Sequence, residues 1–157
     1  MKLGAALAER AGHAREIEQL LGWAIDAARY QEGSEPAESA DVLMSRAGDL
    51  IQKQARLIAR INLTNATVRT ADGESVTEAL ARRDALRALH KMRVSVVDQA
   101  AGHGRRGGLF RSMASELRDI TNVDVPAVRR EITGIAQQIR ELDSAIQQAG
   151  LTADLIE

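Results

Sequence analysis

The amino-acid sequence predicts an all-α protein in which antiparallel helical hairpins form a coiled-coil-like four-helix bundle. Apolar residues return every three and four positions over most of the 157 residues, which is the period of one helix face. The chain has only two prolines and 2% aromatic residues, so it lacks the residues in which β-sandwiches and barrels are rich. At this length we expect a single helical domain spanning residues 1–157.

The first helix is predicted over residues 3–30. Gly33 and Pro36 follow it in a stretch that stops a helix and forms a turn, so the helix should end near Tyr30. A seven-residue frame places its apolar side chains in two columns. These are Leu7, Ala14, Leu21 and Ala28 in one column and Leu3, Ile17 and Ala24 in the other.

The second helix is predicted over residues 40–62, with Ser39 or Asp41 as its cap. Its apolar stripe is wide, which suits a bundle better than a two-stranded zipper. The stripe combines two columns, and a third set of apolar residues widens it. The columns are Leu43, Leu50 and Leu57 beside Ala47, Gln54 and Ile61, and the widening residues are Met44, Ile51 and Ile58. Because the connection to the first helix is short, the two helices should lie antiparallel.

Between residues 64 and 76 the helical period lapses. Asp72-Gly73 lies between β-branched residues, a pattern that predicts a tight β-turn or a small two-stranded ribbon. Ser75 and Glu78 then fit a capping box for a third helix over residues 76–101.

A glycine-rich basic loop is predicted at 102–108, and a partly helical or irregular stretch at 109–123. The fourth helix is predicted over 125–149, with Asp124 as N-cap and Gly150 just past its end. Its apolar residues are spaced alternately by four and three, as in a coiled-coil seam. This candidate association seam consists of Val128, Ile132, Ile135, Ile139, Leu142 and Ile146.

The composition excludes several classes of function. Without any cysteine, the chain can form no disulfide, thiolate zinc site, iron–sulfur cluster or cysteine nucleophile, and a reducing cytoplasm is the expected compartment. The apolar stretch 3–8 is shorter than the roughly 7–15 residues of a secretory signal. The longest charge-free run, 144–153, is shorter than the roughly 20 residues of a membrane-spanning helix. We therefore expect no targeting or transmembrane segment.

The sequence reveals no catalytic constellation, so we expect neither enzymatic activity nor a cofactor. Glu9, His13 and Glu16 share one helix face and could bind a single metal ion, but a solvated polar face is the favoured interpretation. Residues 102–107 match G-x-G-x-x-G, yet they follow a helix instead of a strand. A loop is therefore favoured there over a dinucleotide site.

Positive charge is concentrated in residues 79–118, which hold nine Lys or Arg against three acidic residues and carry +6, leaving −7 for the remainder. This half could bind anions or nucleic acid. The favoured alternative is pairing with the acidic half, since no aromatic residues are interleaved for base stacking. The candidate anion-binding residues are Arg82, Arg83, Arg87, Arg105, Arg106 and Arg111.

Several short stretches together resemble a family of small helical bacterial proteins, mainly actinobacterial, that carry the label septicolysin. The matching stretches are 1–3, 30–36, 61–65, 72–73 with 77–84, 121–125 and 140–143. The resemblance implies a helical fold and self-association, and the label implies a haemolysin-like, membrane-active role. Its polar motif residues are Gln31, Glu32, Asn62, Thr64, Asn65, Arg82, Arg83, Asp84, Arg140, Glu141 and Asp143. Such residues either form a polar site or satisfy free backbone groups at helix ends, and the second is favoured.

These observations favour a cytoplasmic, self-associating protein with a structural or interaction role. A module that binds anions or nucleic acid through residues 79–118 is the alternative. The partner expected first is another copy of the same chain.

Overall fold

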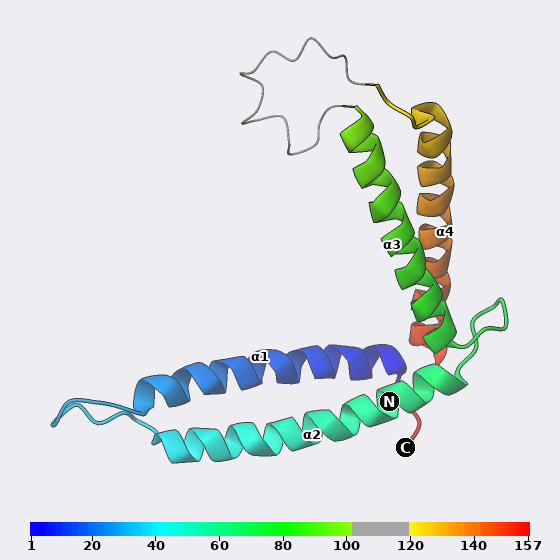
Figure 1. Cartoon of the computed structure of the whole chain (residues 1–157). Helices are drawn as coiled ribbons and strands as arrows, with labels where there is room; N and C mark the ends of the chain where they lie inside the picture. The colour runs from blue at the N-terminus through cyan, green and yellow to red at the C-terminus, as the bar shows by residue number, and fades with distance from the viewer. Residues whose placement is uncertain (102–119) are drawn as a thin grey trace, which may run out of the picture. The chain divides into compact units, whose positions relative to one another are not determined.

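The computed structural model describes residues 1–101 and 120–157, most of which are helical (Figure 1). The helices are α1 (Leu3–Ala27), α2 (Ala40–Thr67), α3 (Val76–Ala100) and α4 (Val125–Thr152). The described residues contain no β-strand beyond two isolated bridges. The predicted all-α class, with helices packing in pairs, is confirmed.

The chain divides into two compact units. Unit 1 comprises Met1–Thr77 and Gln147–Glu157, and unit 2 comprises Glu78–Ile146. Unit 1 therefore holds α1, α2 and the last six residues of α4, whereas most of α3 and α4 belongs to unit 2. The organisation of the whole chain as one domain stays a prediction.

In unit 1, α1 and α2 lie side by side and antiparallel (Figure 1). Near the start of α1, Leu3 and Ala6 pack with Leu57 and Ile61 of α2. Near its end, a second cluster joins Leu20, Ala24 and Ala27 to Leu43 and Leu50. The predicted hairpin is thus held by two apolar clusters, one toward each end.

The connection between α1 and α2 contains a β-turn in which the amide of Ser34 donates to the carbonyl of Gln31 at 2.9 Å. Gly33 has φ +84° at the third position, where a type II turn needs glycine. α1 ends at Ala27, three residues before the predicted Tyr30. Ser39 caps α2, since its hydroxyl accepts from the amide of Val42 at 3.4 Å.

The prediction that the second helix ends at residue 62 is wrong, because α2 continues to Thr67. Thr64 and Thr67 donate their hydroxyls to the carbonyls four residues earlier, Arg60 and Leu63, and are accommodated within the helix. Thr64 also continues the buried column of α2 beyond Leu57 and Ile61.

The Asp72-Gly73 turn is present, with Gly73 at φ +85° and its amide donating to the carbonyl of Thr70 at 3.0 Å. The flanking segments pair only through one antiparallel bridge, between Arg69 and Ser75. The predicted ribbon is therefore reduced to a turn closed by a single bridge, because α2 takes up the residues that would have extended it.

The C-terminal tail, residues 153–157, packs across the open end of the α1–α2 hairpin. The amide of Leu155 donates to the carbonyl of Met1 at 2.8 Å, and the amide of Leu3 donates to Ala153 at 3.0 Å. The Leu155 side chain is buried in the cluster of Leu3 and Ile61. The tail thus joins the start of α1 to the end of α2.

α4 also continues past its predicted end, to Thr152, so Gly150 lies within the helix instead of just beyond it. The Thr152 hydroxyl donates to the carbonyl of Gln148 at 3.0 Å, and the amide of Ala153 donates to Ala149 at 2.9 Å. Gly150 approaches Gly4 of α1, since a Cβ on Gly4 would lie 3.4 Å from the Gly150 carbonyl oxygen. Close helix contact, not helix termination, is what the structure shows at this glycine.

In unit 2, α3 and α4 lie side by side and are antiparallel, because Arg87 pairs with Asp143 whereas Arg93 pairs with Glu131 (Figure 1). Asp124 is the N-cap of α4, as predicted, with its Oδ1 accepting from the amide of Ala127 at 2.9 Å.

Candidate functional site

Part of the predicted polar motif meets between α3 and α4. Arg83 donates to the adjacent Asp84 at 2.9 Å through Nη2 and lies 3.6 Å from Asp143 of α4. Arg87 donates to both oxygens of Asp143, at 3.0 and 3.2 Å. Asp143 therefore faces two guanidinium groups, and the arrangement is one of mutual neutralisation across the helix pair.

The other motif residues are dispersed. Gln31 and Glu32 occupy the turn between α1 and α2, whereas Asn62, Thr64 and Asn65 lie in the last turns of α2, at the opposite end of the hairpin. Thr64 is buried, and its Oγ1 both donates to Arg60 and accepts from the amide of Ile156 at 3.0 Å.

On α4, Glu141 accepts from Gln137 at 2.9 Å, and Arg140 is exposed. The structure thus brings Arg83, Asp84 and Asp143 of the motif together, and it gives Thr64 a structural contact.

Three basic residues of α3, Arg83, Arg87 and Arg93, face acids of α4. Besides the contacts of Arg83 and Arg87, Arg93 donates to Glu131 at 2.6 Å. Arg82 lies on the same helix, while Arg105, Arg106 and Arg111 fall outside the described residues, as does the whole G-x-G-x-x-G stretch. Pairing between basic and acidic side chains within the chain, the favoured interpretation of the charge pattern, therefore occurs in unit 2.

His13 is the central residue of the hypothetical metal face. Its Nε2 lies 3.7 Å from Glu9, and its Nδ1 is buried with no hydrogen-bond partner among the described residues. Within residues 1–101 and 120–157, no three His, Cys, Asp or Glu side chains are grouped so that they could hold a metal ion. No helix in the same part of the chain is long and apolar enough to cross a membrane.

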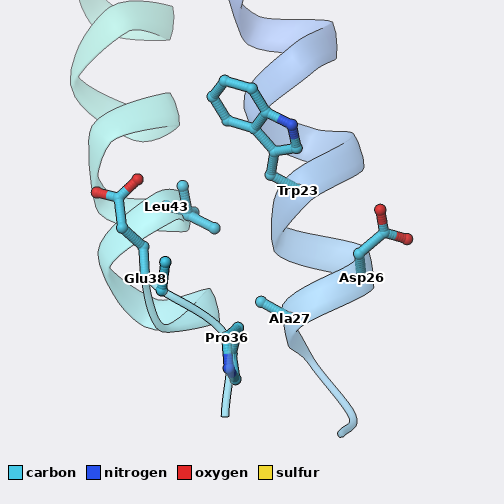
Figure 2. Close-up of a pocket in the computed structure, with 7 residues that line it drawn as sticks. Trp23, Asp26, Ala27, Pro36, Glu38 and Leu43 are labelled. Carbon is cyan, nitrogen blue, oxygen red and sulfur yellow. The ribbon is translucent and has the colours of Figure 1, made fainter. Parts of the chain in front are cut away.

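A hollow of about 360 Å³ lies at the closed end of the α1–α2 hairpin (Figure 2). Trp23, Leu43 and Pro36 contribute apolar walls, and Asp26 and Glu38 contribute carboxylates. Figure 2 shows that Asp26 points away from Leu43 and Glu38, on the outer side of α1. Glu38 accepts two hydrogen bonds from Arg46, at 2.9 and 3.1 Å. The two carboxylates therefore do not converge on the hollow.

A second hollow, of about 280 Å³, follows the groove between α1 and α2 and is almost entirely apolar. Leu21, Met44 and Ile51 line it, yet they remain 56%, 55% and 47% exposed. The complete lining is Ile17, Leu20, Leu21, Ala24, Met44, Ala47, Gly48 and Ile51. We call these eight residues the hairpin groove. Large apolar side chains gathered at a groove in this way typically mark an interaction surface.

The charges of α2 are arranged so that they avoid this groove. In the seven-residue frame, the column Met44-Ile51-Ile58 and the next two columns outward contain no charged residue between positions 44 and 66. The charged side chains lie in the two columns on the other side of the helix. Within this span they are Arg46, Asp49, Lys53, Arg56 and Arg60, whereas Asp41, in the first turn of α2, lies in the column of Gly48.

The candidate association seam of α4 is sheltered within the chain. Ile135 and Leu142 are buried, and the other four seam residues are half-buried. On α3, the stripe that includes Arg83, Leu86, His90, Arg93 and Val97 is likewise buried or half-buried. The apolar stripe of α4 and the mixed apolar and basic stripe of α3 therefore serve the α3–α4 pairing.

Sequence reasoning identified the columns of Leu21 and Met44 as apolar but not as an open groove. The width of the apolar stripe on α2 could have indicated this groove, because contact between two helices buries only part of so wide a stripe. The contacts that the C-terminal tail makes through Leu155 and Arg60 were not predicted from the sequence. Residues 153–157 are too few to show a hydrophobic period.

Comparisons with known proteins give a family but no activity. The crystal structure of a functionally unknown conserved protein from Corynebacterium diphtheriae is similar over 99% of both chains, with a TM-score of 0.88 and 28% sequence identity. No curated protein matches. A family model described as a family of unknown function, DUF6847, matches residues 10–155. Neither description carries the label septicolysin, and the chain belongs to this family of unknown function, DUF6847.

Proposed function

We propose that the protein is a self-associating structural or interaction protein of the cytoplasm and not an enzyme. The observation that carries the proposal is the hairpin groove, where Leu21, Met44 and Ile51 remain about half exposed along one apolar surface. Leaving such side chains in water forgoes roughly 25 cal/mol for each Å² of apolar surface that a partner would cover. Covering this surface is therefore favourable.

The polar chemistry of the described residues supports association over catalysis. In the hollow of Figure 2, Glu38 is engaged by Arg46 and Asp26 points away. In unit 2, Asp143 is neutralised by Arg83 and Arg87. Catalytic sites need acid, base or nucleophile groups converging on one cavity, whereas these carboxylates serve ion pairs or face solvent.

Pairing in unit 2 also makes association the better supported of the two functions considered from the sequence. Binding of nucleic acid requires basic side chains that can neutralise phosphates. Arg87 and Arg93 would first have to leave Asp143 and Glu131.

Sedimentation equilibrium of the purified chain tests the proposal directly. We expect a mass of at least twice the 17.0 kDa of one chain, decreasing toward 17.0 kDa on dilution. A mass of one chain at the highest soluble concentration would overturn the proposal.

A further inference from the structure

We propose that the occupant of the hairpin groove is the hairpin groove of a second copy, so that α1 and α2 of two chains form a four-helix bundle. This inference rests on the proposed self-association and specifies its surface. The four helices would be two antiparallel hairpins related by a two-fold axis, the commonest symmetry of soluble dimers.

The width of the apolar stripes supports this arrangement. Contact between α1 and α2 buries the columns that contain Leu20, Ala24, Leu43 and Leu50. Each helix carries one further apolar column, which contains Leu21 on α1 and Met44 and Ile51 on α2. Because these three residues line one groove, the two extra columns lie on the same side of the hairpin. A helix in a four-helix bundle contacts two neighbours and needs this additional column, whereas a helix in an isolated pair does not.

The charge distribution favours a second copy over a different protein. In a two-fold contact the residues near the axis meet their own copies, so a charge there faces a like charge. On α2 the three columns from Met44 outward hold one charge, Asp41 in the first turn, and on α1 the three columns from Leu21 outward hold Arg15 and Glu18. A groove that selects a different protein typically uses complementary charges for that choice, and between positions 44 and 66 α2 offers none on this side.

The groove also has the space and the area that a dimer needs. A Cβ added to Gly48, in the groove, would meet nothing within 4 Å, so a neighbouring helix can approach closely there. From Leu7 to Ala28 the extra column of α1 is about 30 Å long, and two helices side by side are about 20 Å wide. The face therefore offers roughly 600 Å² per copy and 1,200 Å² in all, the lower end of stable interfaces.

The test compares two substitutions on α2 that differ only in the side of the helix. Ile51→Lys places a charge in the groove, whereas Leu63→Lys places one on the side that already carries Asp49 and Arg56. Ile51 and Leu63 are 47% and 51% exposed in the single chain, so both variants should keep their helical circular dichroism. By sedimentation equilibrium we expect the wild type and Leu63→Lys to be dimers and Ile51→Lys to be a monomer.

A cross-linking experiment tests the same contact without introducing a charge that disrupts it. The chain has no cysteine, so a single introduced thiol reports one position. A bifunctional thiol reagent should join two Ile51→Cys chains efficiently and two Leu63→Cys chains poorly.

The outcomes separate this inference from the proposed function. A wild type that dimerises while Ile51→Lys also dimerises, or equal cross-linking of the two cysteine variants, would overturn the groove contact but leave self-association intact. A monomeric wild type would overturn both. A monomeric wild type that releases dye from phospholipid vesicles, with release abolished in Ile51→Lys, would assign the groove to a lipid surface instead.

Discussion

The α1–α2 hairpin and the α3–α4 pair are built from helices of the same lengths, 25 and 28 residues in each case, but they stabilise their contacts differently. The first hairpin relies on two apolar clusters and leaves further apolar side chains exposed along a groove. The second pair shelters one narrow stripe per helix and flanks it with the ion pairs Arg87–Asp143 and Arg93–Glu131.

This difference shows that helix length and helical period do not decide how many neighbours a helix has. A single apolar column flanked by opposite charges is satisfied by one partner. A second column beside the first stays exposed in an isolated pair. Among residues 1–101 and 120–157 the surplus apolar surface lies mainly in unit 1, although Met92, Val96 and Ile120 of unit 2 are also exposed.

The largest expected effect concerns the α3–α4 contact. Ile139→Lys introduces a charge into the half-buried seam of α4 and should lower the free energy of unfolding by about 2–5 kcal/mol. Leu63→Lys, at an exposed site of α2, should change it by less than about 0.5 kcal/mol. Urea unfolding followed by circular dichroism measures both, and equal effects would contradict the assignment of the seam to internal packing.

Replacing a helical glycine by alanine should have a smaller effect on the free energy of unfolding, and this effect should be equal in the two units. Gly22 of α1 and Gly134 of α4 lie inside helices, and a Cβ at either would meet nothing within 4 Å. Replacing either by alanine should raise the free energy of unfolding by about 0.5–1 kcal/mol, since glycine is the poorer helix former. A loss of stability in either variant, measured by urea unfolding, would show an additional contact at that glycine.

The ion pairs should make the α3–α4 contact sensitive to salt. Asp143→Asn removes the partner of Arg87, and because both side chains are about half exposed, the loss should be about 1 kcal/mol or less. The loss should shrink further at high salt, which screens exposed charges. Thermal unfolding of wild type and variant at low and high salt measures this, and a salt-independent loss would indicate a packing role for Asp143.

The smallest effect concerns the tail. Lys2 lowers the pKa of the Asp154 carboxyl below its ordinary value of 3.8, mainly by donating a hydrogen bond to it and also through its positive charge. A lowered folded-state pKa adds stability that is fully present above 3.8 and is lost as the pH falls through the lowered value. Asp154→Asn should therefore reduce Tm slightly at neutral pH and not at all in strong acid. A difference in Tm that persists in acid would contradict this origin.

The starts of the helices could be predicted from the sequence because the signals are local. Ser39 and Asp124 cap the residues directly after them, and the structure shows both caps. The ends were less predictable, since they depend on contacts from elsewhere in the chain. Thr64 lies inside α2 where its hydroxyl accepts from the distant Ile156, and Gly150 lies inside α4 where it approaches Gly4.

The candidate site was predictable only in part, for a similar reason. Spacing alone placed Leu21 in one apolar column and Met44 and Ile51 in another. Only the folded hairpin shows that these columns share one groove and remain exposed. Conversely, the sign pattern of α3 and α4 indicated pairing but could not assign Arg87 to Asp143, which depends on the register of two antiparallel helices.

The hydrogen bond between Leu155 and Met1 has a practical consequence for protein engineering, because it holds the first and last residues of this sequence close together in space. A short glycine-serine linker could join them, and new ends could be opened in the exposed turn at Gln31–Ser34. In such a circular permutant α1 and α2 would be separated in the sequence but still meet through Leu3, Leu57 and Leu155. The permutant would then measure how much the native connection contributes to holding the two helices together.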